Sequence, residues 1–334
     1  MSPVTCDQVL LVTLAAGMIP VFGPVMAATG NLDPHLISAE QWRSLGAVIT
    51  TSLYGVPDDL VYLSQKCEEH QVQIIEDACH ALDSSLGGRR VGLFGHCAVL
   101  SLAKHFLGSG AILLFRDETD RRELVELLRG TLDSTLGVKA RVAIRQVWQR
   151  LWPGVKKAAV PMIGHRQGLD RTALEVSMQG VPQIQAFDRF LTYDGPIYRC
   201  MPGAAEQART LKLLASLDDQ HEPRLKGTLT LINEGLVDPA MALPTDCGLL
   251  RVPVFVEQRE AAITALAGHR VFVTPVYDPP LNEFAPWMEN WSGTWSPLQH
   301  RWSRSVLPVN PAAASQIVQA WRALPPNLRA APLH

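Results

Sequence analysis

The sequence predicts an α/β protein with a mostly parallel sheet and flanking helices, followed by a smaller C-terminal α+β domain. Between residues 46 and 115, short apolar runs alternate with an amphipathic segment, the pattern of buried parallel strands joined by crossover helices. The 334 residues are 47% hydrophobic and 19% charged, which is typical of a globular protein with a sizeable core. We expect three parts: a large cofactor-binding domain (1–117), a helical insertion and linker (118–203), and a small domain (204–334).

The N-terminal apolar stretch, residues 9–28, is long enough to cross a membrane. Pro20 and Pro24 interrupt it, however, and no Lys or Arg precedes Arg43, so neither a membrane anchor nor a signal peptide is favoured. We expect a helix that ends near Gly17 and then a short strand over 19–22.

The next hundred residues contain the predicted sheet. Apolar runs predict four strands, and a segment that follows Pro57 with Leu60, Leu63 and Cys67 on one face predicts a helix. The strands are expected at 46–55, 72–78, 97–102 and 110–115, with the helix at 58–70.

The rest of the chain is predicted to be mainly helical. Helices are expected over 118–152 and 204–220, and the C-terminal third adds a strand, 249–256, and helices over 258–268 and around 317–324. Three tryptophans spaced four apart, at 287, 291 and 295, could receive a sugar or a base, although packing is the commoner role of tryptophan.

The net charge and the cysteine spacing indicate which kinds of binding partner are favoured. A net charge of −2 gives no general attraction to nucleic acid or to anionic membranes, so small-molecule partners are favoured. The six cysteines form no CxxC pair and match no zinc spacing, which predicts reduced thiols, a cytoplasmic protein and no metal site.

Two charged residues stand out because they occur in apolar surroundings. Asp77 ends a predicted strand after two isoleucines, and Lys104 lies in an apolar run that leads into glycines. An unpaired charge is costly to bury. Asp77 could cap the following segment and Lys104 could extend to solvent. Together, however, they suit pyridoxal phosphate (PLP), whose pyridinium pairs with a carboxylate and whose aldehyde takes an amine as a Schiff base.

The residues around this pair resemble a family. The stretch "GVPDDLVYLSQKCEEHQVQIIEDACHALDSSLGGRRVGLFGHCAVLSLAK" (55–104) is similar to the core signature of the DegT/StrS-type sugar aminotransferases. Upstream residues 3–34 and several short stretches from residue 198 onwards are similar to further landmarks of that family. The resemblance implies a fold type I PLP enzyme that aminates a keto-sugar nucleotide, with glutamate as the amino donor.

The resemblance assigns roles to five residues. Lys104 becomes the Schiff-base lysine and Asp77 the partner of the pyridine nitrogen. His80 replaces a glutamine that contacts the cofactor's ring oxygen, Ser101 becomes a phosphate ligand, and Cys6 falls near the residue that covers the ring. The adjacent His105 leaves open a dehydratase-like alternative, because a branch of the family has histidine in place of the lysine.

The resemblance also leads to expectations about the length of the chain and its oligomeric state. Family members carry, ahead of the point that Met1 matches, a turn whose backbone amides hold the cofactor phosphate. We therefore expect an N-terminally truncated, divergent member. It would be a homodimer or a heteromer with a full-length homologue, and Arg199 matches an arginine that follows a contact with the partner. The alternative function is a catalytically impaired subunit of a full-length aminotransferase.

Overall fold

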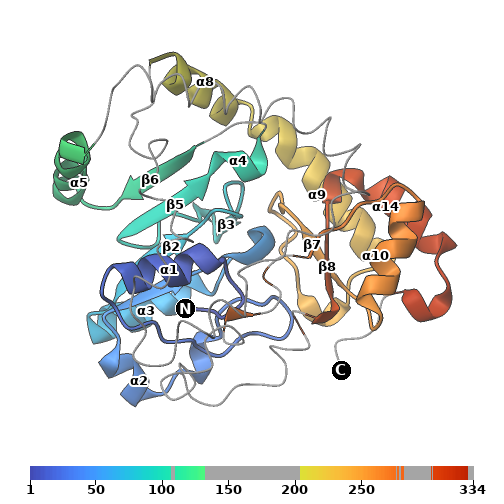
Figure 1. Cartoon of the computed structure of the whole chain (residues 1–334), viewed down its shortest axis with the longest axis horizontal. Coiled ribbons are helices and arrows are strands. Elements are labelled where there is room, and N and C mark those ends of the chain that lie inside the picture. Colours follow the sequence, from blue (N-terminus) through green and yellow to red (C-terminus); the bar gives the residue numbers. More distant parts are fainter. Residues whose placement is uncertain are drawn as a thin grey trace, which may run out of the picture.

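The computed structural model describes residues 1–106, 110–131, 204–275, 277, 280–281, 302 and 304–329. In Figure 1 the central sheet and its helices form one lobe, the C-terminal elements form a second, and α9 runs from the edge of the first lobe into the second. Most of the predicted insertion, with Arg199 and the three spaced tryptophans, lies outside the described residues. The predicted domain boundaries stay a prediction.

The central sheet confirms the predicted α/β class. Its strands are β1 (Ala47–Thr50), β2 (Gln73–Asp77), β5 (Cys97–Ser101) and β6 (Ala111–Phe115), in the order β1-β2-β5-β6. β1, β2 and β5 are parallel, whereas β6 pairs with β5 in the antiparallel direction. All four predicted strands are therefore present, and the sheet is mostly parallel.

Helix α3 (Leu60–His70) is the crossover between β1 and β2. Its N-cap is Asp59, whose carboxylate accepts the backbone N–H of Tyr62, and it ends at Gln71 in the left-handed conformation. The predicted apolar face is buried, because Leu60, Leu63 and Cys67 pack into the core beneath the sheet.

The N-terminal segment departs from the prediction at one element. Helix α1 (Asp7–Ala15) is present, but residues 19–22 form no strand. Pro20 has no N–H to donate to a sheet ladder. The segment is held instead by the chain terminus, since the Met1 amine donates to Val21 O at 2.9 Å and Gly23 N–H donates to Met1 O at 2.9 Å.

The remaining elements of this lobe are short, apart from one helix of 14 residues. Helix α2 (Ala39–Ser44) begins with a capping box between Ser38 and Gln41. The others are β3 (Ser85–Leu86), β4 (Arg89–Arg90), α4 (Leu102–His105), α5 (Glu118–Thr131), η1 (Pro34–Leu36) and η2 (Leu53–Gly55). Among the described residues, no helix is both long enough and apolar enough to cross a membrane.

The C-terminal lobe is a two-stranded antiparallel sheet covered by helices, whereas α8, the first helix of the C-terminal part, lies beside the first lobe (Figure 1). Where one helix was predicted over 204–220, two are found, and between them Leu217 packs into the core of the first lobe. The prediction did not include β8, which pairs with β7. The described elements of the C-terminal part of the chain are α8 (Ala204–Ala215), α9 (Asp218–Asn233), η5 (Pro239–Met241), β7 (Val252–Phe255), α10 (Arg259–Gly268), β8 (Val306–Val309), η7 (Pro311–Ala313), α14 (Ala314–Ala323) and η8 (Pro326–Leu328).

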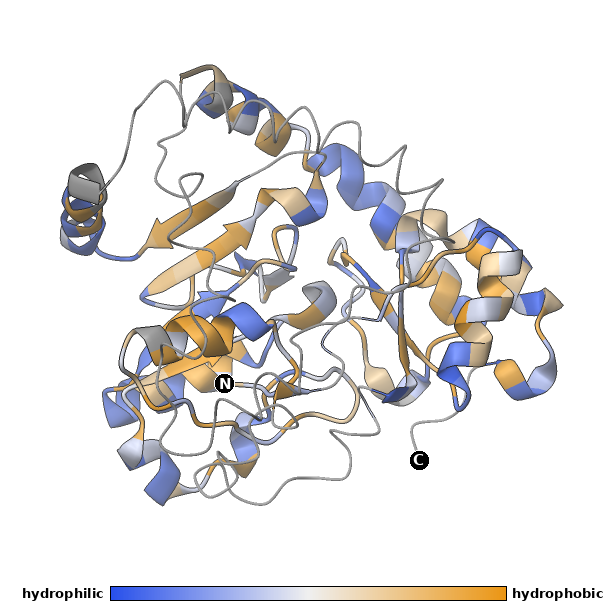
Figure 2. Cartoon of the chain, viewed as in Figure 1, coloured by the Kyte–Doolittle hydropathy of each residue, from blue (hydrophilic) through white to orange (hydrophobic). Residues whose placement is uncertain are grey.

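Two hydrophobic clusters form the core, and Figure 2 shows the apolar strands that contribute to them. One lies beneath the central sheet and includes Leu217 from the C-terminal part. The other fills the C-terminal lobe and includes Val4 and Tyr54 from the N-terminal part. Each cluster thus contains residues from both parts of the chain, which ties the two lobes together.

Glu76 is a fully buried carboxylate in β2, with 0% of its surface exposed. Its oxygens accept three backbone N–H groups from the turn that precedes β5: Gly92 at 2.7 Å, Phe94 at 2.6 Å and Gly95 at 2.5 Å. Three donors on one carboxylate compensate its removal from water. Because successive strand residues face opposite sides, the next residue, Asp77, points to the other face of the sheet.

Replacing Glu76 by Gln should lower the free energy of unfolding by about 3 kcal/mol. The amide NH₂ would face a backbone N–H, and buried donors would lose their charged acceptor. Urea denaturation of Glu76→Gln, with the exposed Glu68→Gln on α3 as the matched control, measures this difference. Equal midpoints for the two variants would contradict the structural role of Glu76.

Candidate functional site

The candidate site begins where β2 ends. Asp77 is half-buried, and its Oδ1 accepts the backbone N–H of Cys79 at 3.1 Å, so it caps the turn that follows the strand. β2 pairs in parallel with β5, with Asp77 opposite Val99, so the two strands end on the same side. Ser101 ends β5, is half-buried, and does not cap α4 with its side chain.

Lys104 lies on the one-turn helix α4. The helix buries Leu102 and His105, which leaves Lys104 exposed on the opposite side. Its Nζ donates to the hydroxyl of Tyr277 across 3.5 Å. The lysine is therefore not a buried, unpaired charge, and its position rather than its burial makes it a candidate functional group.

His80 is buried, with 8% of its surface exposed, and both its ring nitrogens are engaged by the protein. Nδ1 accepts the backbone N–H of Tyr54 at 3.1 Å, and Nε2 lies 3.2 Å from the hydroxyl of Tyr277. Burial, and secondarily the charge of Lys104, lowers the pKa of His80 well below its ordinary value. The imidazole is therefore neutral, and its Nδ1 is the acceptor.

Aromatic rings stack on both sides of His80. The Tyr277 ring lies 5.8 Å from it and the Tyr54 ring 6.0 Å, both nearly parallel, and Tyr54 stacks in turn on Trp302 at 5.7 Å. Trp302 meets Phe255 of β7 edge-on. This column of rings extends from the site into the core of the C-terminal lobe, so that lobe fixes the orientation of His80.

Electrostatic interactions join the remaining groups. The pKa of the Cys6 thiol is raised to about 11, chiefly by burial and only weakly opposed by Lys104. Burial also raises the pKa of the Cys79 thiol, which interacts with Asp77, Lys104 and Cys6. Tyr277 interacts with Cys6, Asp77 and Cys79. Of the predicted site residues, the structure thus brings together Cys6, Asp77, His80 and Lys104, with Ser101 at the end of the adjoining strand.

A buried arginine supports α4 from behind. Arg224 of α9 donates to His105 Nδ1 at 3.0 Å and to Gln220 Oε1 at 2.8 Å. Burial, and then the charge of Arg224, lowers the pKa of His105 to about 4. His105 is thus a neutral acceptor for a cation, and it connects the helix that carries Lys104 to the C-terminal lobe.

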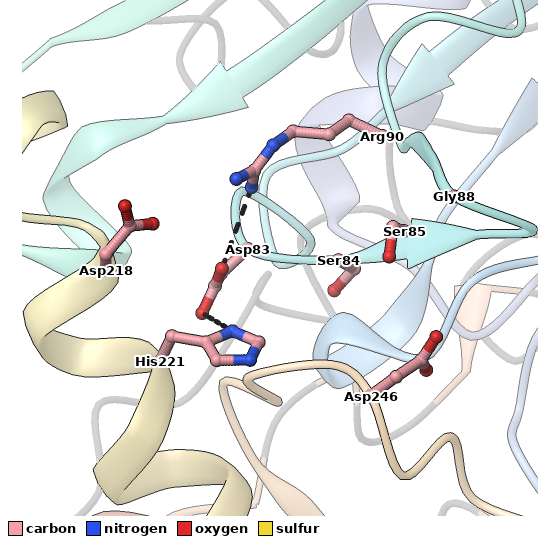
Figure 3. A pocket seen from close by; sticks show the side chains of 8 residues that line it. All are labelled: Asp83, Ser84, Ser85, Gly88, Arg90, Asp218, His221 and Asp246. Carbon is pink, nitrogen blue, oxygen red and sulfur yellow. Dashed lines mark hydrogen bonds and ion pairs between the residues drawn. The ribbon is translucent and has the colours of Figure 1, made fainter.

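A polar pocket of about 300 Å³ lies at a second junction between the lobes (Figure 3). Its centre is Asp83, only 4% exposed, whose carboxylate lies 3.0 Å from His221 Nδ1 and 3.7 Å from Arg90 Nη1. No group of ligands suited to a metal ion is found within the described parts of the chain. The pocket is lined by Asp83, Ser84, Ser85, Gly88, Arg90, Asp218, His221 and Asp246.

The sequence prediction missed two residues of this arrangement, Tyr277 and Arg224. Tyr277 follows an apolar stretch for which no element was predicted, and it is 173 positions from Lys104. Arg224 is an arginine in an ordinary helical sequence, and only packing shows that it is buried. No sequence signal marks either residue.

The chain has the fold of sugar aminotransferases of known structure. An aminotransferase of the DegT, DnrJ, EryC1 and StrS type from Brucella abortus aligns with a TM-score of 0.65 and 18% identity, over 96% of this chain and 77% of that one. The aminotransferase TlmJ from Streptoalloteichus hindustanus aligns with a TM-score of 0.64 and 20% identity, over 96% and 77%. The predicted fold type I architecture is confirmed.

Similarity to a family is found over the N-terminal part. Residues 2–141 match the model of the DegT/DnrJ/EryC1/StrS aminotransferase family. The pleiotropic regulatory protein of Geobacillus stearothermophilus is 30% identical over 118 residues, which are 34% of this chain and 31% of that protein. The GDP-perosamine synthase of Vibrio cholerae is 27% identical over 85 residues, 25% of this chain and 23% of that protein. The chain thus matches less than a third of the length of either of these two relatives.

The neutral, buried His105 predicts a loss of stability in acid. An unfolded histidine binds its proton near pH 6.5, whereas the folded state resists protonation of His105 down to about pH 4. This contribution to stability is fully present above pH 6.5 and is lost as the pH falls towards 4, and by pH 4 the loss amounts to about 3 kcal/mol.

Replacing His105 by Gln keeps an acceptor for Arg224 but removes the titrating group. The free energy of unfolding should therefore fall between pH 7 and pH 4 by about 3 kcal/mol less in His105→Gln than in the unaltered chain. Denaturant titrations at both pH values measure this, with the half-buried His70→Gln as the control. An unchanged pH dependence would contradict the neutral state of His105.

Proposed function

We propose that the chain is a PLP-dependent aminotransferase that transfers an amino group to a keto-sugar nucleotide or a related small molecule. The observation that supports it most directly is the placement of a carboxylate, Asp77, at the end of β2 and of an amine, Lys104, just beyond the end of the neighbouring parallel strand β5. In α/β sheets the carboxyl ends of the strands are where ligands bind.

The donor set suits the ring of PLP. Asp77 supplies a negative charge for the pyridine nitrogen, Lys104 supplies an exposed amine for the aldehyde, and Cys6 lies near Lys104. Ser101 supplies a hydroxyl for the phosphate group. When bound, the cofactor supplies an electron sink for the substrate carbon.

Residues of the chain would orient the reacting groups and transfer the proton of the substrate carbon. The Lys104 amine is exposed, so it can reach a substrate carbon, and its hydrogen bond to Tyr277 restricts its orientation. Lys104 Nζ would act as the general acid and base that removes and returns the proton of the substrate carbon. Asp77, fixed by the Cys79 N–H, keeps the pyridine nitrogen protonated.

The substrate class comes from the relatives. One relative is a GDP-perosamine synthase, another is a dTDP-4-dehydro-2,6-dideoxy-D-glucose 3-dehydratase, and the similar structure DesI was determined with its TDP-sugar product. These names support a nucleotide-linked keto sugar as the acceptor. Glutamate as the donor, a cytoplasmic location, and assembly as a homodimer or with a full-length homologue rest on the sequence and the resemblance alone.

Lys104 should be the residue that PLP modifies. Addition of PLP followed by borohydride should fix one cofactor on the peptide that contains Lys104, because reduction makes the Schiff base permanent. Lys104→Ala should abolish that label, and the control Lys66→Ala on α3 should retain it. Mass spectrometry of the digested protein measures both results.

Two outcomes would contradict this proposal. A label that persists in Lys104→Ala would show that Lys104 is not the residue that forms the Schiff base with PLP. An unaltered chain that takes up no PLP would remove the aminotransferase function and leave the alternative of a non-catalytic partner subunit.

Asp77 should affect how tightly PLP binds but not whether PLP labels Lys104. Asp77→Asn keeps an oxygen that can accept the Cys79 N–H but loses the charge, so PLP should bind about tenfold more weakly while still labelling Lys104. Titration of PLP absorbance measures the affinity. The matched control is the exposed Asp120→Asn on α5, and equal affinities in the two variants would refute the pairing with the pyridine nitrogen.

A further inference from the structure

Tyr277 occupies an unusual position between two hydrogen-bond donors. Its hydroxyl oxygen lies 3.5 Å from Lys104 Nζ and 3.2 Å from His80 Nε2. Both Tyr277 and Tyr54, the two tyrosines that contact His80, have positive φ angles, 61° and 60°. Bulky residues rarely adopt this conformation, and it tends to occur at functional sites.

The direction of each hydrogen bond follows from the chemistry of the donors. Because Tyr54 N–H donates to Nδ1 of a neutral ring, the His80 hydrogen is on Nε2 and points to Tyr277. A lysine ammonium can only donate. Both lone pairs of the Tyr277 oxygen therefore accept, and its own hydrogen must be donated elsewhere.

That hydrogen has no acceptor in the part of the chain that the structure describes, where the Tyr277 hydroxyl contacts only the two donors. Burial raises the pKa of Tyr277, so the hydroxyl keeps its proton. Tyr277 thus presents an O–H donor beside the Lys104 amine, within the group formed by Cys6, Asp77 and Cys79. A buried O–H group without a protein acceptor is suited to donate to an oxygen atom of a bound ligand.

We propose that Tyr277 donates its hydroxyl hydrogen to the phenolic oxygen of PLP, and that His80 is a positioning residue behind it. In PLP this oxygen is on the ring carbon next to the one that bears the aldehyde, so it lies beside the amine that attacks the aldehyde. His80 has both nitrogens occupied by Tyr54 and Tyr277, and it acts through Tyr277. The inference rests on the proposed function.

The experiment is a spectroscopic titration of the PLP-loaded chain and its Tyr277→Phe variant. Phenylalanine keeps the ring that stacks on His80 and removes only the hydroxyl. A donor to the phenolate stabilises its negative charge, so its loss makes the lysine-bound cofactor more basic. The pH midpoint of its absorbance change should rise by about one unit, and PLP should bind about tenfold more weakly.

The matched control is Tyr62→Phe on α3, which should leave both quantities unchanged. Neither Tyr277→Phe nor Tyr62→Phe changes the other charged and titratable groups that face Tyr277 and His80. These groups are Tyr54, Cys6, Asp77, Cys79, Lys104, His105 and Arg251. A second variant, His80→Gln, can preserve both contacts of the histidine, because its amide has an acceptor and a donor. It should shift the midpoint less than Tyr277→Phe, and in the double variant it should add nothing.

The outcomes separate the two proposals. A lysine-bound band in the unaltered chain with the same midpoint in Tyr277→Phe would overturn the assignment of Tyr277 and leave the proposed function standing. An additive shift in the double variant would show that His80 contacts the cofactor directly, which also overturns it. No band in the unaltered chain would overturn both proposals.

Discussion

The end of β2 is the constraint on which the site depends. Glu76 and Asp77 are adjacent carboxylates that the pleat of the strand directs to opposite faces. Glu76 is buried and accepts three backbone N–H groups, which fixes the turn before β5 and so the position of that strand. Asp77, held by Cys79 N–H, is then presented on the face where the strand ends. Without the first carboxylate, the second would have no fixed neighbour in β5.

The C-terminal lobe completes the site. Arg224 of α9 holds His105 and with it the turn that carries Lys104, and the stacked rings from Trp302 to Tyr277 fix His80. Asp83 and His221 join the lobes at a further point. These contacts share one physical feature, since each sets a buried polar group against a partner from a distant part of the sequence. Their geometry is therefore specified only when both lobes are packed.

Much of the candidate site could be predicted from the sequence because its residues lie within one continuous motif. Asp77, His80, Ser101 and Lys104 all lie within residues 55–104, where strand ends follow from apolar runs. Their roles stay a prediction. Tyr277 could not be found in this way, because its importance comes from the convergence of two donors on its hydroxyl, and neither donor is near it in the sequence.

The sequence by itself determined the α/β class, the four strands of the central sheet and the helix between the first two, since buried strands and one-sided helices leave periodic patterns. It also carries the match of residues 2–141 to the model of the DegT/DnrJ/EryC1/StrS aminotransferase family. Tertiary structure decided that β6 runs antiparallel, that residues 19–22 form no strand, and that α8 and α9 are separate helices. It also decided that Lys104 is exposed and meets Tyr277. The physical reason is that periodicity records which face of an element is buried, whereas strand direction and side-chain partners depend on what packs against that face.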